Sequence, residues 1–146
     1  MRQLSDSTAV VETNPGEAID LRRRLRRDMA DVIVARAEEL PPGDAALLQS
    51  IYGDGRSVTS LAPMLGCDVR KLRRRVKRLI ARLRSAEFIY VISHRHKWTA
   101  SRRRVAEACF IRGLSIRQAS RDLNLTYHTV RRHAEALRAL VQAAGT

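Results

Sequence analysis

The chain has 146 residues and only 4% of them are aromatic, which predicts one or two small domains with an aliphatic, helical core. Its formal net charge of +13 is uneven, because residues 1–54 hold 7 basic and 10 acidic side chains whereas residues 55–146 hold 21 and 5. Two cysteines, no secretory signal pattern and no long apolar run argue against a disulfide-stabilised, secreted or membrane-spanning protein, so we expect a cytoplasmic, nucleoid-associated protein whose second part binds a polyanion.

The first predicted element is an amphipathic helix over residues 14–41, which follows a polar segment, residues 1–13, that we expect to be flexible. Asn14 can cap this helix, with Glu17 completing a capping box, and two prolines end it. Its apolar side chains recur at steps of three or four: Leu21, Leu25, Met29, Val32 or Ile33, and Leu40. This stripe either covers the core of the next unit or serves as a surface for dimerisation or for a partner protein. The five arginines within residues 22–27 circle the helix, which favours a solvated or partner-facing surface over a DNA-binding one.

From there on, the sequence repeats itself at an offset of 58 residues. We call residues 42–84 the first unit and residues 99–146 the second unit. Each reads as a helix, a tight turn and a final helix whose exposed face is rich in arginine. The matching positions include Gly55 and Gly113, Ser57 and Ser115, Leu65 and Leu123, Gly66 and Asn124, Asp68 and Thr126, Leu72 and Val130, and Arg73-Arg74 and Arg131-Arg132.

The first unit begins with a short helix from Asp44 to Tyr52. Ser57 or Thr59 caps the second helix, Gly66 supplies a left-handed turn residue, and Asp68 caps the final helix. The second helix is expected to turn inward Leu61, Ala62 and Leu65. The final helix is expected to bury Leu72, Val76, Leu79 or Ile80, and Leu83. That spacing leaves six cations outside: Arg70, Lys71, Arg73, Arg74, Lys77 and Arg78.

Residues 85–98 connect the two units and have no counterpart in the repeat. The run Phe88-Ile89-Tyr90-Val91-Ile92 is β-branched and aromatic, so it fits a short strand or a continuation of the preceding helix that packs both units together. A strand would need a partner strand, which the same segment of a second copy could provide. The run from His94 to Trp98 resembles a basic loop near phosphate, and Trp98 is expected to anchor the core.

The second unit follows the same plan. Thr99 is expected to cap its first helix, Gly113 ends that helix, Asn124 takes the left-handed turn position, and Thr126 caps the final helix. The first helix is expected to turn inward Val105, Ala106, Cys109 and Phe110. The final helix is expected to bury Val130, Ala134, Leu137 and Val141 and to expose Tyr127, His128, Arg131 and Arg132.

An arginine-rich helix after a tight turn is a common device for placing a helix in the major groove of DNA. Side chains in its first turn reach base edges, and those a turn later, with those of the preceding helix, lie nearer phosphates. The candidate base-reading residues are Val69, Arg70, Tyr127 and His128. The candidate phosphate-contacting and supporting residues are Ser57, Lys71, Arg73, Arg74, Lys77, Arg78, Ser115, Arg117, Gln118, Arg121, Thr126, Arg131 and Arg132.

No motif for enzymatic chemistry accompanies this pattern. A nucleophile elbow, a phosphate loop and a paired carboxylate cluster are all missing from the sequence. His94 and His96 could ligate zinc with a cysteine, but Cys67 and Cys109 both lack a Cys-x-x-Cys partner. We therefore predict no catalytic residues, no metal and no cofactor.

Two sets of residues carry resemblances to known families. The first set is Leu40-Pro41-Pro42, Leu47-Leu48, Gly55, Ser57, Leu61-Ala62, Leu65-Gly66 and the run from Leu72 to Arg84. In type and spacing it resembles the C-terminal promoter-binding region of bacterial sigma factors, particularly the extracytoplasmic-function type. The second set is Gly113-Leu114-Ser115, Gln118, Ser120, Leu123, Thr126 and the run from His128 to His133. It is similar to the DNA-binding domain of LuxR-type regulators. Only residues 1–41 precede the first unit, so we do not expect a complete sigma factor.

These observations predict an all-α fold with two tandem helix-turn-helix units, an N-terminal helix and a short connector that can be extended. The resemblances imply a sequence-specific, double-stranded DNA-binding transcriptional regulator whose two final helices enter adjacent major-groove segments. One alternative is an adaptor in which one unit binds DNA and other parts bind RNA polymerase or another regulator. Another is the DNA-recognition subunit of a phage or mobile-element machine. A homodimer through the N-terminal helix or through residues 88–92 is compatible with each.

Overall fold

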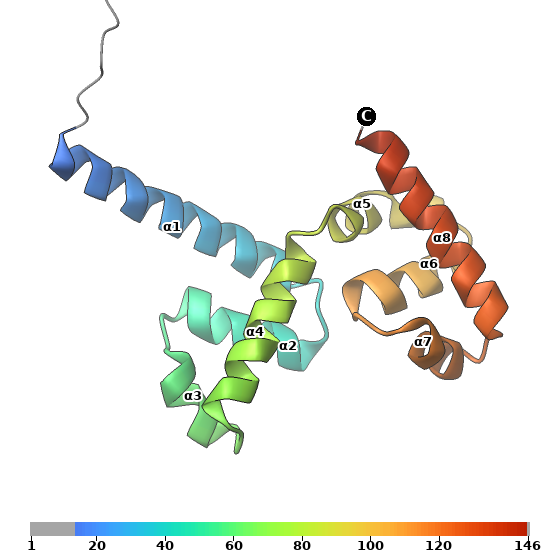
Figure 1. Cartoon of the computed structure of the whole chain (residues 1–146), viewed down its shortest axis with the longest axis horizontal. Helices are drawn as coiled ribbons and strands as arrows, with labels where there is room; N and C mark the ends of the chain where they lie inside the picture. The colour runs from blue at the N-terminus through green and yellow to red at the C-terminus, as the bar shows by residue number, and fades with distance from the viewer. Residues whose placement is uncertain (1–13, 146) are drawn as a thin grey trace, which may run out of the picture.

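The computed structural model describes residues 14–145, in which all regular elements are helical, so the all-α prediction is confirmed (Figure 1). The prediction for residues 1–13 lies outside the described residues. Within residues 14–145, no helix is both long enough and apolar enough to cross a membrane. The α-helices are α1 (Pro15–Ala37), α2 (Pro42–Leu48), α3 (Val58–Met64), α4 (Val69–Leu83), α5 (Ala86–His94), α6 (Ala100–Ala106), α7 (Ile116–Leu123) and α8 (Tyr127–Ala144). Two π-helical turns, η1 (Gln49–Gly53) and η3 (Glu107–Ile111), continue α2 and α6, and a 3-10 turn, η2 (Arg95–Lys97), follows α5.

The structure repeats with the offset seen in the sequence. The elements α6, η3, α7 and α8 each begin 58 residues after α2, η1, α3 and α4, respectively. The turn between the last two helices uses the same conformation in both units, with φ of 64° at Gly66 and 54° at Asn124. Glycine adopts this left-handed conformation without strain and asparagine tolerates it, so the turn prediction is confirmed at both positions.

Side-chain caps fix where the helices of both units begin. Ser57 accepts a hydrogen bond from the backbone of Ser60 (3.1 Å), and Asp68 accepts one from Arg70 (2.7 Å). Asn14 caps α1 by accepting from Gly16, and the capping box expected there with Glu17 is not formed. The capping box of the described chain lies instead in the second unit, between Ser115 and Gln118.

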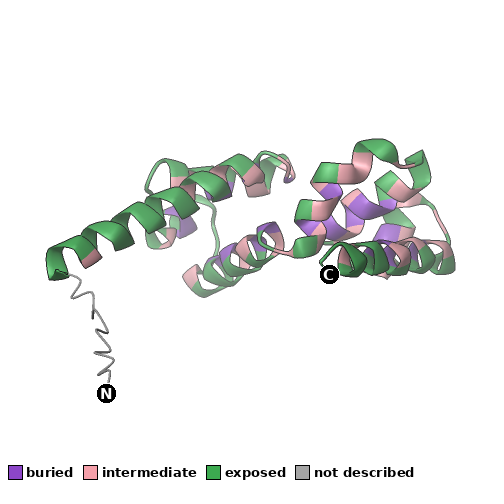
Figure 2. Ribbon diagram, turned by 90° about the horizontal axis from the view of Figure 1, so that it is seen from above, coloured by how far each residue is buried: buried purple, intermediate pink, exposed green. Residues whose placement is uncertain are grey.

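Helix α1 covers the first unit with its C-terminal part alone. Ile33 and Ala37 are buried against that unit, together with Leu40 in the turn that follows the helix. The N-terminal part projects away from the rest of the chain and its surface is exposed (Figures 1 and 2). The exposed apolar residues along this part are Ile19 (51%), Leu21 (54%), Leu25 (58%), Met29 (49%) and Val32 (45%). The core-covering interpretation therefore holds only for the C-terminal part of the stripe.

The connector is a helix, so of the two alternatives the strand is wrong and a helix that packs both units together is confirmed, although it is separate from α4. Helix α4 ends at Leu83, and Ser85 starts α5 by accepting a hydrogen bond from the backbone of Phe88 (3.2 Å). Phe88 and Val91, three residues apart on α5, are 0% and 1% exposed. Burial on one helical face has overridden the β-propensity of this run. Pairing of residues 88–92 as a strand with a second copy is thereby excluded.

A single hydrophobic core runs through both units. It contains Leu48 and Leu72 of the first unit, Phe88 of α5, and Ala134 and Leu137 of the second unit. A smaller cluster lies within the second unit alone and is formed by Val105, Ala108, Ala119 and Val130. The half-buried Trp98 packs against the larger core, with its ring 6.1 Å from that of Tyr90, as expected of an anchor. The two units are therefore parts of one packed body.

One predicted core residue is on the surface instead. Leu65 is 53% exposed, although its counterpart in the repeat, Leu123, packs against the smaller cluster. The residues of the first unit that correspond to Val105, Ala119 and Val130 of that cluster belong to the larger core instead: Leu47, Leu61 and Leu72. The neighbouring Met64 is 69% exposed.

Candidate nucleic-acid interface

The final helices of the two units, α4 and α8, lie on the same face of the molecule. Figure 1 draws both in front of the helices that support them, and Figure 2, turned by 90°, shows both along one edge. In each unit, the first turn of this helix lies at the end farther from α5 (Figure 1). The side chains that α4 and α8 present outward therefore face the same side of the protein.

Helix α4 carries a strip of cations along its exposed side. Leu72, Val76, Leu79 and Leu83 are buried, as their spacing predicted. The opposite side exposes what we call the α4 strip: Arg70, Lys71, Arg73, Arg74, Lys77 and Arg78. Across residues 14–145, no carboxylate forms an ion pair with the strip. Its one hydrogen bond through a charged group is a long one, 3.4 Å, from Arg74 to the carbonyl of Arg70.

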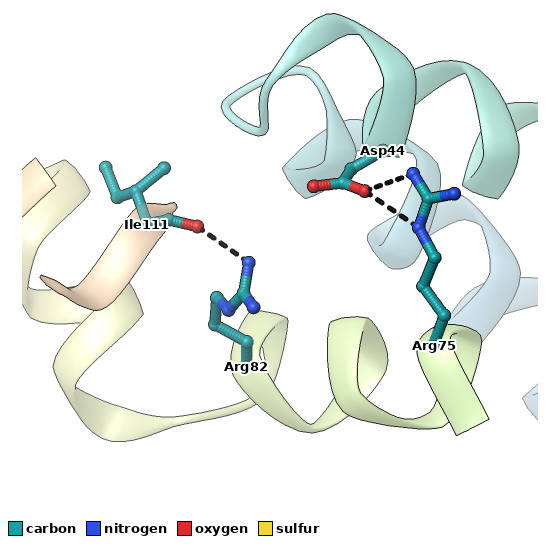
Figure 3. A network of polar contacts seen from close by, with 4 residues as sticks. All are labelled: Asp44, Arg75, Arg82 and Ile111. Atoms are coloured by element: carbon teal, nitrogen blue, oxygen red, sulfur yellow. Dashed lines mark hydrogen bonds and ion pairs between the residues drawn. The ribbon is translucent and has the colours of Figure 1, made fainter. Parts of the chain in front are cut away.

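The remaining arginines of α4 hold the helix in place. Arg75 donates two hydrogen bonds to Asp44 of α2, at 2.7 and 3.2 Å (Figure 3). Arg82 donates to the carbonyl of Ile111 in the second unit at 3.1 Å, and burial lowers the pKa of its guanidinium. The cations of α4 are thus divided by position: two of them anchor the helix, and the strip stays free to meet a polyanion.

Helix α8 presents fewer free charges than α4. Tyr127 is 46% exposed, and His128 and Arg132 are exposed as well. Arg131 is exposed as predicted, but it pairs with Glu135 one turn later (2.9 Å), and this carboxylate raises the pKa of Arg131. Partial burial, then Arg102 and Arg132, lower the pKa of His133, which favours its neutral form. The second unit is therefore the less cationic of the two along this helix.

Several predicted phosphate-contacting side chains also cap helices. Ser57, Ser115 and Thr126 each accept a backbone hydrogen bond at the start of a helix. A hydroxyl that accepts in this way keeps a proton to donate, so capping leaves a contact to phosphate open at Ser57 and Ser115, whereas the Thr126 hydroxyl also hydrogen-bonds that of Thr129 at 2.8 Å. Arg117 and Arg121 of α7 are exposed and line, with Ser120 and Tyr127, an open hollow of about 380 Å³ beside α8.

The basic run after α5 is not placed as a free phosphate-binding loop. Arg95 bonds Glu39 at 2.6 Å and lies 3.8 Å from Glu107, and so joins the turn after α1 to the second unit. Sequence reasoning instead overlooked Arg56, which is exposed just before α3 and donates to the sulfur of Met64 (3.9 Å). Its counterpart in the repeat is Leu114, so a search for repeated residues could not find it. Its position next to the cap Ser57 was the available signal.

No cluster of three histidines, cysteines or carboxylates that could hold a metal ion is found between residues 14 and 145. Comparisons of the chain with protein-family models, with curated proteins and with solved structures give no significant match. The sigma-factor and LuxR-type resemblances therefore stay predictions that depend on the residues quoted for them.

Proposed function

We propose that this protein is a transcriptional regulator that binds double-stranded DNA sequence-specifically, with α4 and α8 in adjacent major-groove segments. The observation that carries the proposal is the sorting of cations on α4. Its two other arginines, Arg75 and Arg82, are bonded to protein groups, whereas the α4 strip is exposed and forms no ion pair with any of residues 14–145. Unpaired cations that lie close together on one helix face repel one another, and bound phosphates would reduce this repulsion.

The positions of α4 and α8 suit the proposed binding mode. Each follows a helix and a tight turn, and its first turn carries exposed side chains, Arg70 on α4 and Tyr127 and His128 on α8. The major groove admits a single helix, with the side chains near its N-terminus reaching base edges. Cations farther along α4 would then lie along the phosphate strands. Because both helices face one side, a single chain could contact two groove segments about one helical turn apart.

Selection from a pool of random duplexes at two salt concentrations tests this proposal. We expect an enriched bipartite motif with a fixed spacing, because each final helix would read its own half-site. Changing Arg131→Gln together with Arg132→Gln should then remove footprint protection over one half of the site only. Retention without sequence preference that disappears at higher salt would instead identify generic polyanion binding and contradict the proposal.

A second function, that of an adaptor, is favoured by α1. Its exposed stripe borders a mostly apolar groove of about 300 Å³, to which Leu25, Met29 and Val32 contribute together with Leu83 of α4. Contiguous exposed apolar surface on a protruding helix marks a site for protein contact more than one for DNA. In this variant of the proposal, RNA polymerase, another regulator or a second copy of the chain binds α1 while α4 holds DNA.

Alanine at both Leu21 and Leu25 separates the two functions. Because these side chains are 54% and 58% exposed, we expect the melting temperature and the DNA affinity of the variant to match those of the wild type. Light scattering and partner capture should show the loss of any complex that α1 makes. In contrast, the control Ile33→Ala, at a site 3% exposed, should destabilise the fold by about 2–5 kcal/mol. If the wild type forms a dimer and the double alanine variant loses both this dimer and its DNA affinity, the proposal that a single chain binds the whole DNA site would be contradicted.

A further inference from the structure

We infer that the first and second units form one rigid body in which Arg82 and Arg95 hold α4 and α8 at a fixed separation, so that the protein accepts a single spacing between half-sites. The part of this inference that concerns half-sites rests on the proposed function. The rigid coupling rests on contacts between the units and can be tested without DNA.

Helix α5 provides the apolar part of the coupling. It contacts α4 on one side and both η3 and α8 of the second unit on the other. Phe88 and Val91 are buried almost completely within the core that includes Leu83, Ile111 and Leu137. A flexible linker would leave such side chains exposed. The segment between the units is therefore a packed spacer of fixed length.

Arg82 adds a polar contact that depends on a glycine. Its guanidinium donates to the carbonyl of Ile111 at 3.1 Å (Figure 3). It also lies against Gly113, where an added Cβ would collide with it. The counterpart of Gly113 in the first unit, Gly55, has a similar φ (74° against 71°) but no atom within 4 Å of an added Cβ. Gly113 thus makes room for a contact between the units that has no equivalent at Gly55.

Arg95 adds an ionic contact at the C-terminal end of the connector helix. Its guanidinium lies 2.6 Å from Glu39, just after α1, and 3.8 Å from Glu107 in η3. The side chain of Arg95 is 29% exposed, so solvent screens these pairs only in part. The three residues line a cleft of about 570 Å³ between the turn after α1 and the second unit, together with Leu40 of the core. One guanidinium therefore ties the second unit to this turn, and α1, which precedes it, packs against α2 and α4 of the first unit.

A fixed separation limits which DNA sites fit. Each added base pair moves a half-site by about 3.4 Å along the duplex and rotates it by roughly 35°. If α4 and α8 are held rigidly, they cannot adapt to both the shift and the rotation, so one of the two helices loses contacts with its half-site. Loosely joined units could adapt to both. Spacing preference is thus a direct consequence of the coupling, and Arg82 and Arg95 are positioning residues for it.

The test compares the wild-type chain with a variant carrying Arg82→Gln and Arg95→Gln. Spin labels at the exposed Cys67 and at Ala139→Cys on α8, in a Cys109→Ala background, report the separation of the units by pulsed electron resonance. We expect a narrow distance distribution for the wild type and a broad one for the variant. On the selected site, changing the spacing by one base pair should cost the wild type about tenfold in affinity, the size of a mismatch, and the variant clearly less.

Four further variants test whether the effect is specific to these contacts. Arg112→Gln removes an ion pair of 2.6 Å with Asp122 inside the second unit and should leave the distribution narrow. Lysine in place of glutamine at position 95 (Arg95→Lys) should restore part of the narrow distance distribution. Gly113→Ala should broaden the distribution, whereas Gly55→Ala should not, although both substitutions are strained by their positive φ.

The outcomes separate the two proposals. A narrow distribution in the double variant, or equal binding of the wild type to all spacings, overturns the inference. A wild type that shows the narrow distribution but binds no duplex specifically overturns the proposed function and leaves the rigid coupling standing.

Discussion

Replacing Arg73, Arg74 and Lys77 with glutamine should lower the affinity for the selected duplex about 100-fold or more at low salt. These three side chains are exposed on α4, and no ion pair in the described part of the chain neutralises them. Each contact to a phosphate releases condensed counterions, so losing three should also reduce the slope of log affinity against log salt by about three. Titrations by fluorescence anisotropy at several salt concentrations measure both quantities.

The matched control is the same charge change on α1. Arg23, Arg24 and Arg27 are exposed on a helix outside the proposed interface, and glutamine is a good helix former at each position. The affinity of this control variant should stay within about threefold of the wild type, and its slope of log affinity against log salt should stay within one unit. If both triple variants lost affinity equally, net charge alone would account for binding, and α4 would have no special role.

The repeat and the boundaries of its helices could be predicted because they depend on local rules. The offset of 58 residues is kept by every paired element, including the two π-helical turns. Caps at Ser57, Asp68 and Thr126 were recognisable because a short polar side chain before an apolar period satisfies free N–H groups. The buried side of α4 was set by steps of three and four, which place residues on one helix face.

The connector could not be assigned from the sequence, because its conformation is decided by packing. The run from Phe88 to Ile92 has high β-propensity, and only the burial of Phe88 and Val91 between the two units selects a helix. The signal that could have found it was Ser85, a capping residue placed directly before the run. Local composition and the cap pointed in different directions, and the tertiary contacts agree with the cap.

The partners of the structural arginines were beyond sequence reasoning, although spacing alone separated the six outward cations of α4 from Arg75 and Arg82. Arg75 bonds Asp44, which lies 31 residues earlier. Arg95 likewise reaches Glu39 across 56 residues. Which carboxylate an arginine meets depends on how the elements pack, so spacing cannot identify the partner. The contrast between these bonded arginines and the α4 strip, which forms no ion pair within residues 14–145, supports the proposed function.

Phe88→Ala should cause the largest loss of stability that we expect from a single substitution in this chain. The Phe88 ring is fully buried and belongs to the core that both units share. Removing it leaves a cavity, which typically costs about 3–5 kcal/mol in the free energy of unfolding. Because the cavity lies between the units, we also expect them to unfold separately, whereas the wild type unfolds in one transition. Urea denaturation followed by far-UV circular dichroism and by Trp98 fluorescence measures both effects.

The control for this experiment is the next residue on α5. Ile89 is 37% exposed, so Ile89→Ala removes a comparable apolar group from the same helix without opening a cavity between the units, and it should cost about 1 kcal/mol or less. A variant at Phe88 that lost no more stability than this control would mean that α5 merely tethers the units. The spacing of α4 and α8 would then be free to vary, and one fixed spacing between half-sites would no longer be expected. The stability loss expected for Phe88→Ala and the preference for one spacing between half-sites are therefore linked, because both depend on how α5 packs between the units.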